Sequence, residues 1–321
     1  MPAILTHYTF AILAHPKENN PLYFPLTNLG AQGPDTFMAY GSVPWIKRDE
    51  KAKVQGFGHA MHKIDVAETY LKMAKYALEH GNSDPLYAFL DGLLMHYCLD
   101  RVMHAYIFYR SGFDENGQLT GYYSWSHGFF EAILDKVYAT RKGTYQKLAK
   151  CIICDEELVK EASKMWAACS PTPLGEDDFY NSYKDFVAAE NLLWNPRGIK
   201  RPLFKLIGKY STPYSQCHPK SIAPFEVIDV TNDKHSEWMN PATGEIHNES
   251  VDEMFEIALK DFAKAHELIV RFQNGEDVEK EFYAFTNNWN HEGIPVGKKN
   301  VHQNLCWEVL KKPKYLPPKK K

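Results

Sequence analysis

One stretch of the sequence, residues 83 to 109, limits most strongly what this chain can fold into. It reads SDPLYAFLDGLLMHYCLDRVMHAYIFY, with Ser83 or Asp84 as a helix cap and Pro85 in the first turn. The stretch is long and mostly apolar, and a helix that is apolar around most of its circumference is buried on several sides. It therefore predicts a long central helix that other elements surround.

Helical patterns also dominate the rest of the chain. Ser250 and Glu253 have the spacing of a capping box at the start of a long final helix. Further helices are predicted, from apolar residues at helical spacing, within residues 1–20, 63–82, 126–143, 155–170 and 178–194. Gly81 is expected to end the helix within 63–82. No run of residues indicates a strand, so we predict an all-α fold.

The domain organisation follows from where the helical pattern stops. Residues 196–248 are rich in Pro, Tyr, His and Ser and show no period, which predicts an irregular segment packed over the helices. We expect one multi-helix domain over residues 1–275, built around a metal site. Residues 276–321 are expected to be a C-terminal extension with a basic tail.

Composition and charge exclude several classes of protein. With 44% hydrophobic and 24% charged residues, the chain is globular, and a net charge of −3 gives no reason to expect nucleic-acid binding. No apolar run is long enough for a membrane span, and the N-terminus lacks a signal peptide's basic leader, so a cytoplasmic location is expected. The tail KKPKYLPPKKK could touch an anionic membrane surface weakly, although a solvated chain end is favoured.

The six cysteines do not indicate a disulfide framework in a chain of this length, and they fit a reducing compartment. Cys151 and Cys154 have the two-residue spacing of a zinc knuckle, but the sequence has no second pair to complete it. We expect them to be two buried thiols on a helix.

Ligand chemistry is concentrated in the central helix. His96, Asp100 and His104 follow one another at four-residue intervals, so they point to nearly one face. This row is about 12 Å long at 1.5 Å per residue, too long for one ion to contact all three residues. The spacing therefore predicts at least two metal ions along the face, with Asp100 able to bridge them.

A second pair, His127 and Glu131, has the same spacing on another predicted helix. A single buried histidine is more often a satisfied core residue than a ligand. Two such constellations favour a metal site, because burying several polar and charged groups without a compensating ion is costly. Further candidates with ligand chemistry are His7, Asp35 and His62.

Five motifs occur in an order that resembles one known family. They are THYTFA, LGAQGPD, GHAMH, MHYCLDRVMHAY and SHGFFEAILD, and together they resemble the bacterial zinc-dependent phospholipase C family. EWMNPATGE is similar to a segment of its cytosolic relatives. The resemblance covers residues 1 to about 140 well and 235–275 loosely. It implies a helical bundle around three zinc ions that hydrolyses the phosphodiester between diacylglycerol and a head group.

The resemblance also implies a ligand set. Asp100 would bridge from a first zinc to a third, which His7 also binds. The first zinc would be held by Asp35, His62, His96 and Asp100, and the second by His104, His127 and Glu131. In secreted members the N-terminal residue completes the third site, whereas here six residues precede His7 and the family's N-terminal Trp is absent. Two or three zinc ions are therefore expected.

The implied reaction is attack of a metal-activated water on phosphorus, in a phospholipid or a head-group-like phosphoester. Asp35 is the candidate catalytic residue, as a general base or as a ligand only. Two alternatives stay open: a zinc nuclease or phosphomonoesterase, for which an aromatic pocket is expected, and a non-catalytic metal-stabilised binding protein. His59 competes with His62 as a ligand and is expected nearby or exposed. His15 and His80 are expected at helix ends.

Overall fold

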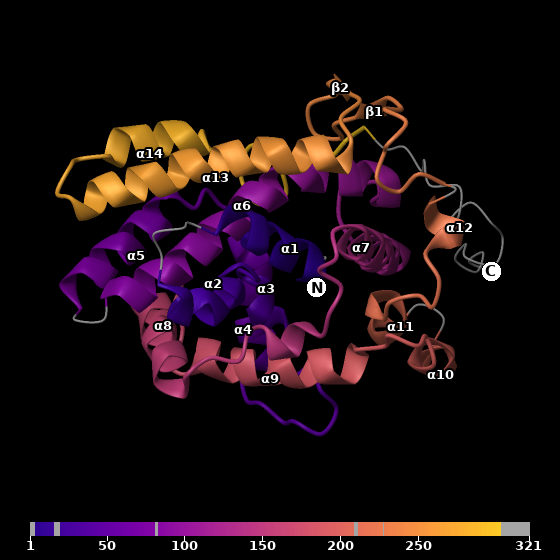
Figure 1. The fold of residues 1–321 in the computed structure, drawn as a ribbon, viewed down its shortest axis with the longest axis horizontal. Helices are drawn as coiled ribbons and strands as arrows, with labels where there is room; N and C mark the ends of the chain where they lie inside the picture. Colours follow the sequence, from indigo (N-terminus) through magenta and orange to yellow (C-terminus); the bar gives the residue numbers. More distant parts are fainter. Residues whose placement is uncertain (1–3, 16–19, 81–82, 209–210, 227, 303–321) are drawn as a thin grey trace.

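The computed structural model describes residues 4–15, 20–80, 83–208, 211–226 and 228–302. It confirms the all-α prediction, since these residues form helices and one small two-stranded sheet (Figure 1). None of the described helices combines the length and the apolar character needed to cross a membrane.

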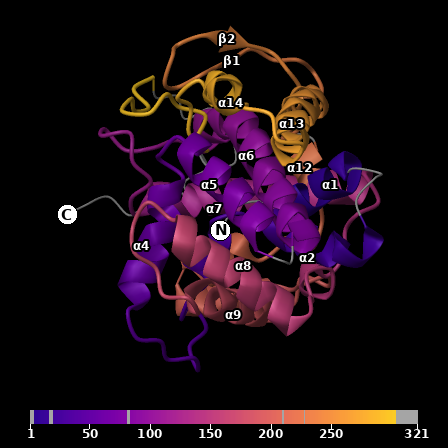
Figure 2. The ribbon, with the colours of Figure 1, turned by 90° about the vertical axis from the view of Figure 1, so that its left-hand side faces the viewer.

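The predicted central helix is α6 (Ser83–Ser111), and it is confirmed as the element around which the others pack. Its buried side chains run from Leu86 to Ser111 on several sides of the helix. Figure 2 shows α6 near the middle of the molecule. The helices in contact with it include α1 (Ile4–Ala14), α2 (Phe24–Gly30), α5 (Ala67–Glu79), α7 (Tyr122–Arg141), α8 (Glu156–Cys169) and α13 (Val251–Gln273).

A second group of helices covers one side of this core. α9 packs against α8, and the short α3 packs against both α4 and α9. Their bounds are α3 (Asp35–Met38), α4 (Lys51–Met61) and α9 (Asp178–Leu193), with short 3-10 helices η1 (Pro21–Tyr23) and η2 (Leu148–Lys150) elsewhere. α3 and α4 place Asp35 and His62 beside α6.

Two glycines let α2 approach α6 very closely. A Cβ on Gly92 of α6 would lie 2.2 Å from the carbonyl oxygen of Thr27, and one on Gly30 would lie 2.3 Å from that of Phe89. Real side chains cannot occupy such positions without moving a backbone. This crossing fixes where the chain leaves α2 and begins the turn that leads to Asp35.

The expectation for residues 196–248 was only partly right. Instead of a wholly irregular segment, the described part contains α10 (Lys200–Ile207), α11 (Thr212–Gln216), α12 (Ala223–Glu226) and the antiparallel strands β1 (Trp238–Met239) and β2 (Ile246–His247). Asn240 closes the hairpin, because its side-chain oxygen accepts the backbone N–H of Ala242. Elements of two to eight residues are too short to leave a period in the sequence.

The chain after residue 248 continues the helical domain. The predicted capping box is confirmed, because Ser250 accepts the backbone N–H of Glu253 and donates its own N–H to the Glu253 carboxylate. The segment expected as an extension begins with α14 (Glu279–Thr286), which packs against α13 and α5. The expected basic tail lies outside the described residues, as does Gly81.

The cysteine expectation was wrong in its details. Cys151 and Cys154 lie in the turn between η2 and α8 rather than on a helix, and both are half-buried. Each thiol contacts a backbone carbonyl, that of Lys147 and that of Ile152. Neither belongs to a group of ligand atoms close enough to hold a metal among the described residues.

Candidate metal centre

The structure brings the eight predicted ligands together along one face of α6. They form three groups whose ligand atoms lie within 4.8 Å of one another. The groups are His7–His96–Asp100, Asp35–His62–His96 and His104–His127–Glu131. Five different elements supply them: α1, the start of α3, the residue after α4, α6 and α7.

The Asp35–His62–His96 group lies where the turn after α2 meets α6. His62 Nε2 is 3.2 Å from Asp35 Oδ1 and 3.8 Å from Asp100 Oδ2. Gly33, with a φ of +56°, allows this approach, because a Cβ there would lie 2.3 Å from the His96 ring. The absence of a side chain at Gly33 thus lets the Asp35 turn lie directly against His96.

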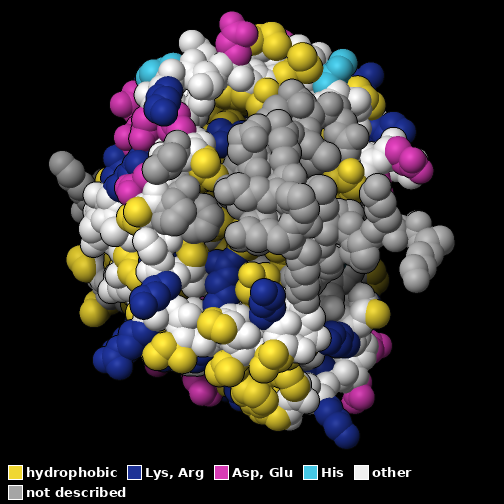
Figure 3. Space-filling model, turned by 90° about the vertical axis from the view of Figure 1, so that its right-hand side faces the viewer, with side chains coloured by type: hydrophobic (Ala, Val, Ile, Leu, Met, Phe, Trp, Pro, Cys, Tyr) yellow, Lys and Arg dark blue, Asp and Glu magenta, His cyan; other side chains and the backbone are white. Residues whose placement is uncertain are grey.

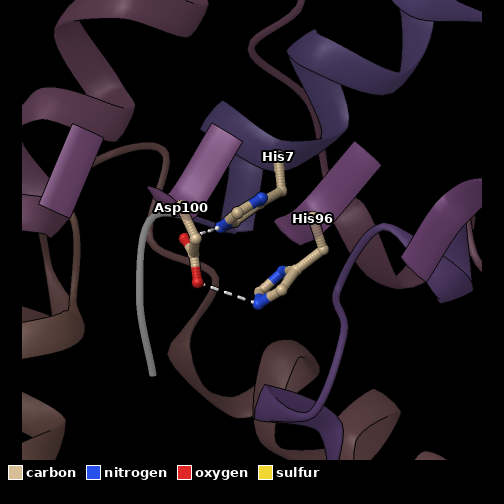
Figure 4. A group of neighbouring side chains, drawn as sticks. All are labelled: His7, His96 and Asp100. Carbon is tan, nitrogen blue, oxygen red and sulfur yellow. Dashed lines mark ion pairs between the residues drawn. The ribbon is translucent and has the colours of Figure 1, made fainter. Parts of the chain in front are cut away.

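Asp100 lies between the His96 and His7 imidazoles and offers one oxygen to each. Its Oδ2 is 3.0 Å from His96 Nε2, and its Oδ1 is 3.1 Å from His7 Nε2 (Figure 4). The His7 and His96 rings stack with their centroids 4.3 Å apart. This is the geometry that a bridging carboxylate requires, since each oxygen faces a different set of nitrogen atoms.

The third group joins α6 to α7. His127 Nε2 is 3.0 Å from Glu131 Oε1, and His104 Nε2 is 3.8 Å from the same oxygen. The His104 and His127 rings are parallel, with centroids 5.8 Å apart. The i, i+4 spacing on α7 therefore points both of its ligands at His104.

Backbone and hydroxyl groups orient four of the imidazoles. The Nδ1 atoms of His62, His96 and His104 lie within hydrogen-bond distance of the carbonyl oxygens of Gly58 (2.8 Å), Ala31 (3.1 Å) and His291 (2.9 Å). His127 Nδ1 is 3.4 Å from Ser111 Oγ. In its neutral form, a histidine whose Nδ1 donates in this way presents an unprotonated Nε2, which is the usual arrangement behind a metal ligand.

α1 is held in place by a carboxylate of α7. Asp135, which is buried, accepts the backbone N–H of Leu5 at 2.9 Å and that of Thr6 at 2.6 Å. The Thr6 hydroxyl donates to it as well. Asp135 therefore satisfies free N–H groups in the first turn of α1 and fixes the position of His7.

Several atoms of the centre are buried without a hydrogen-bond partner among the described residues. They are Asp35 Oδ1, His62 Nε2, His96 Nε2, Asp100 Oδ2 and Glu131 Oε1. Leaving a buried polar atom unpaired costs about 1–3 kcal/mol, and more when the group is charged. Because these atoms are all imidazole nitrogens or carboxylate oxygens and point at one another, a bound metal ion fits them.

The electrostatics of the centre keep Asp35 and Asp100 ionised. Burial by itself raises the pKa of Asp35, but the His62 and His96 imidazoles hold it below its usual range. Burial acts the same way on Asp100, and His104, His96 and His7 hold the pKa of that carboxyl well below its usual range. Burial lowers the pKa of His62, yet Asp35 and Asp100 raise it to about 9. Asp35 and Asp100 thus carry negative charge for a cation at neutral pH.

The sequence analysis missed His291, which follows α14. Its ring is fully buried, with its centroid 5.2 Å from that of His62 and 5.4 Å from that of His96. Burial and the nearby His62 and His96 hold its pKa well below the usual range, so the ring is neutral. Its backbone carbonyl accepts from His104, as described above. No local motif marks it, because it lies in a loop far along the chain from the other ligands.

A cleft of about 620 Å³ opens onto the centre. Asp35, His62, His104, His127 and Glu131 line it, whereas His7, His96 and Asp100 lie behind them. The remaining lining residues include Lys51, Lys63, Phe108 and Trp125. This volume is in the range of small-molecule sites. A small molecule in the cleft would therefore lie beside the side chains that could hold metal.

His59, His15 and His80 lie where the sequence predicts. His59 is exposed and lines the cleft one turn before His62. His15 directly follows α1, and its ring contacts Phe24. His80 follows α5, where its Nδ1 donates to the carbonyl of Tyr76 at 2.8 Å. None of these three belongs to the groups of ligand atoms.

Comparison with known proteins gives no further identification. No protein-family model, curated protein or solved structure matches this chain. The site itself therefore defines the class: a helical domain with three groups of buried ligands that could hold metal ions.

Proposed function

We propose that this protein is a zinc-dependent phosphoric ester hydrolase of the phospholipase C type, acting on the phosphodiester of a phospholipid or of a head-group-like molecule. The observation that supports it best is the set of three neighbouring ligand groups beside one open cleft. Imidazole and carboxylate donors in this mixture are the usual ligands of zinc. The order of the motifs, which resembles that of zinc-dependent phospholipases C, supports the same reaction.

Each group of side chains has a distinct part in this proposal. His104, His127 and Glu131 would hold one ion and Asp35, His62, His96 and Asp100 another, while His7 and Asp100 would share a third. When bound, zinc polarises a phosphoryl oxygen and lowers the pKa of a water ligand toward about 7. The burial of these side chains strengthens the charge interactions among them.

Asp35 is the proposed catalytic residue. It lines the cleft, it is ionised, and its Oδ1 has no hydrogen-bond partner among the described residues. A carboxylate in this state can orient an attacking water and accept its proton, or bind metal, or do both. Lys51 and Lys63 on the cleft wall would attract a substrate that carries a negative phosphate.

Nuclease or phosphomonoesterase activity is the second candidate. Phe108 and Trp125 line the cleft, and the Phe108 ring lies with its centroid 5.1 Å from that of His127. Aromatic rings beside a phosphate site are the feature expected for stacking a base. A third possibility is a metal-stabilised binding protein in which no metal position is open to substrate.

One set of assays separates these functions. Metal is counted by inductively coupled plasma spectrometry on the purified protein, and hydrolysis is measured on p-nitrophenyl phosphorylcholine, p-nitrophenyl phosphate and single-stranded DNA. We expect at least two zinc ions per chain and turnover of the phosphodiester. Asp35→Asn should lose turnover, while Asp49→Asn, an exposed aspartate of the loop before α4, serves as the control. A metal-loaded protein inactive on all three substrates would refute the proposed hydrolase.

A further inference from the structure

α10 carries an apolar stripe that faces solvent. Ile199, Leu203, Leu206 and Ile207 have the spacing i, i+4, i+7 and i+8, which places them on one side of a helix. Their exposed fractions are 63%, 59%, 84% and 70%. We call these four residues the α10 stripe. An ordinary surface helix turns such a stripe toward the core, whereas α10 turns it toward solvent.

The inward side of α10 explains how the helix is held in this orientation. The Arg201 guanidinium lies over the Phe129 ring of α7 at 4.4 Å and over the Tyr214 ring of α11 at 5.0 Å. Lys200 donates to the carbonyl oxygen of Leu192 at 2.7 Å. Arg201 and Lys200 thus anchor the helix, and the aliphatic side chains of the stripe are left outside.

The segment that contains the stripe carries charge of one sign. Residues 191–225 contain six Lys and Arg and no Asp or Glu, although the whole chain has a net charge of −3. Arg197, Lys205 and Lys220 are exposed. The face that carries α10 shows hydrophobic side chains beside Lys and Arg side chains (Figure 3). Exposed aliphatic groups flanked by cations are the pattern of an interfacial helix on an anionic bilayer.

The position of α10 connects this surface to the cleft. α10 packs on α11, and Thr212, Pro213 and Ser215 of α11 line the cleft that leads to the metal centre. In Figure 1 both helices lie at the same end of the molecule, beside α7. A flat anionic surface in contact with the stripe would therefore lie next to α11, which forms part of the cleft wall.

We propose that α10 docks the protein on an anionic membrane surface, with the α10 stripe inserted among the lipid head groups and Arg197 and Lys205 near the lipid phosphates. Aliphatic side chains gain by leaving water, and the cations gain by neutralising anionic lipid, so the two contributions add. This surface is distinct from the basic C-terminal tail.

Co-sedimentation with vesicles tests the docking. The full chain is mixed with vesicles of phosphatidylcholine alone or of phosphatidylcholine with phosphatidylglycerol, at low and at high salt. We expect binding to the anionic vesicles only, weakened by salt. The double variant Leu206→Ser/Ile207→Ser should lower the partition coefficient on the order of tenfold. Leu22→Ser/Ile246→Ser, which alters two exposed aliphatic residues elsewhere, should bind as the parent does.

A second pair of variants tests the charges. Arg197→Gln/Lys205→Gln should weaken binding to the anionic vesicles, whereas Lys298→Gln/Lys299→Gln, equal in charge and exposed after α14, should not. All substituted residues are exposed, and thermal melts verify that each variant folds. If the stripe variant binds as well as the parent, or the parent does not bind, membrane docking at α10 is wrong.

The other possible occupant is a second copy of the chain. Size-exclusion chromatography at several concentrations would then show a dimer that Leu206→Ser/Ile207→Ser dissociates, with no vesicle binding by the parent, and this result would overturn the membrane proposal. Sedimentation with vesicles measures no catalysis. The failure of docking and the failure of the proposed hydrolysis are therefore distinguishable.

Discussion

Asp100 differs in position from the other carboxylates of the centre, because its two oxygens face two different imidazoles, that of His96 at 3.0 Å and that of His7 at 3.1 Å. We expect Asp100→Asn, which keeps the shape and removes the charge, to lose more bound zinc than His127→Ala. The histidine substitution should empty mainly the site that His104 and Glu131 share with it. Metal analysis on equally folded samples makes the comparison. Equal zinc in Asp100→Asn and the parent would exclude the bridging role.

Glu190 on α9 should make stability depend on pH. Burial and the nearby Asp135 raise its pKa to about 8, against about 4.5 in the unfolded chain. Between these values the folded protein holds a proton that the unfolded chain has released, so Glu190 lowers the free energy of unfolding as pH rises from about 4.5 to 8. Glu190→Gln should remove this contribution, which amounts to a few kcal/mol.

The test is denaturant unfolding of parent and Glu190→Gln at a series of pH values. The variant should gain stability relative to the parent as pH rises toward 8. Glu267→Gln, at an exposed position of α13, is the matched control and should follow the parent throughout. If the difference between Glu190→Gln and the parent is constant over this range, the raised pKa is wrong.

At the scale of single residues, sequence reasoning worked where ligands share a helix. The four-residue spacing on α6 and α7 is enough to bring His96 beside Asp100 and His127 beside Glu131, because helix geometry is regular. It could not reach His291, whose approach to His62 depends on how α14 packs after a long separation along the chain. The anchoring of α1 by Asp135 was out of reach for the same reason.

At the scale of elements, the crossing of α2 and α6 is the contact on which the Asp35–His62–His96 group depends. Gly92→Ala would place a methyl group 2.2 Å from the carbonyl oxygen of Thr27, so α2 must move away. We expect a loss of about 1–3 kcal/mol of stability, as for other overpacked positions. Because α2 leads into the Asp35 turn, zinc binding should weaken as well.

Gly56 offers the matched control for this substitution. It lies within α4, is exposed, and a Cβ there meets no atom within 4 Å. Gly56→Ala should therefore raise stability by up to about 1 kcal/mol through helix propensity. Chemical denaturation of both variants checks the opposite signs. A Gly92→Ala protein as stable as the parent would mean that the crossing is looser than the structure shows.

Long helices were predictable and short elements were not, for a physical reason. α6 and α13 bury apolar side chains over many turns, so apolar residues recur at helical spacing in their sequences. α10 has eight residues with Pro202 inside it and its apolar stripe faces outward, which is the reverse of the pattern that identifies a helix by its core face. The two-residue strands β1 and β2 are set by their turn rather than by alternation.

At the scale of the whole molecule, the ligand groups lie inside the core and join elements far apart in sequence. α1, α3, α4, α6 and α7 all end or cross at the metal centre, and α14 reaches it through His291. Without an ion, three buried carboxylates face one another across imidazoles, and several of their atoms have no hydrogen-bond partner within the part of the chain that the structure describes. Metal binding should therefore contribute to the stability of the fold.

Removal of metal tests this directly. If ions bind the folded state with concentrations near a thousand times their Kd, each site adds about 4 kcal/mol to the free energy of unfolding. The loss of two such sites lowers the melting temperature of a chain this long by about 10 °C or more. We expect EDTA to produce this decrease, and stoichiometric zinc, added after the EDTA is dialysed away, to reverse it.

Calcium should not reverse the decrease, because it prefers six to eight oxygen ligands and this centre is built mainly of imidazoles. A melting temperature that stays the same after metal analysis has verified complete removal would show that the eight residues do not form an internal metal centre.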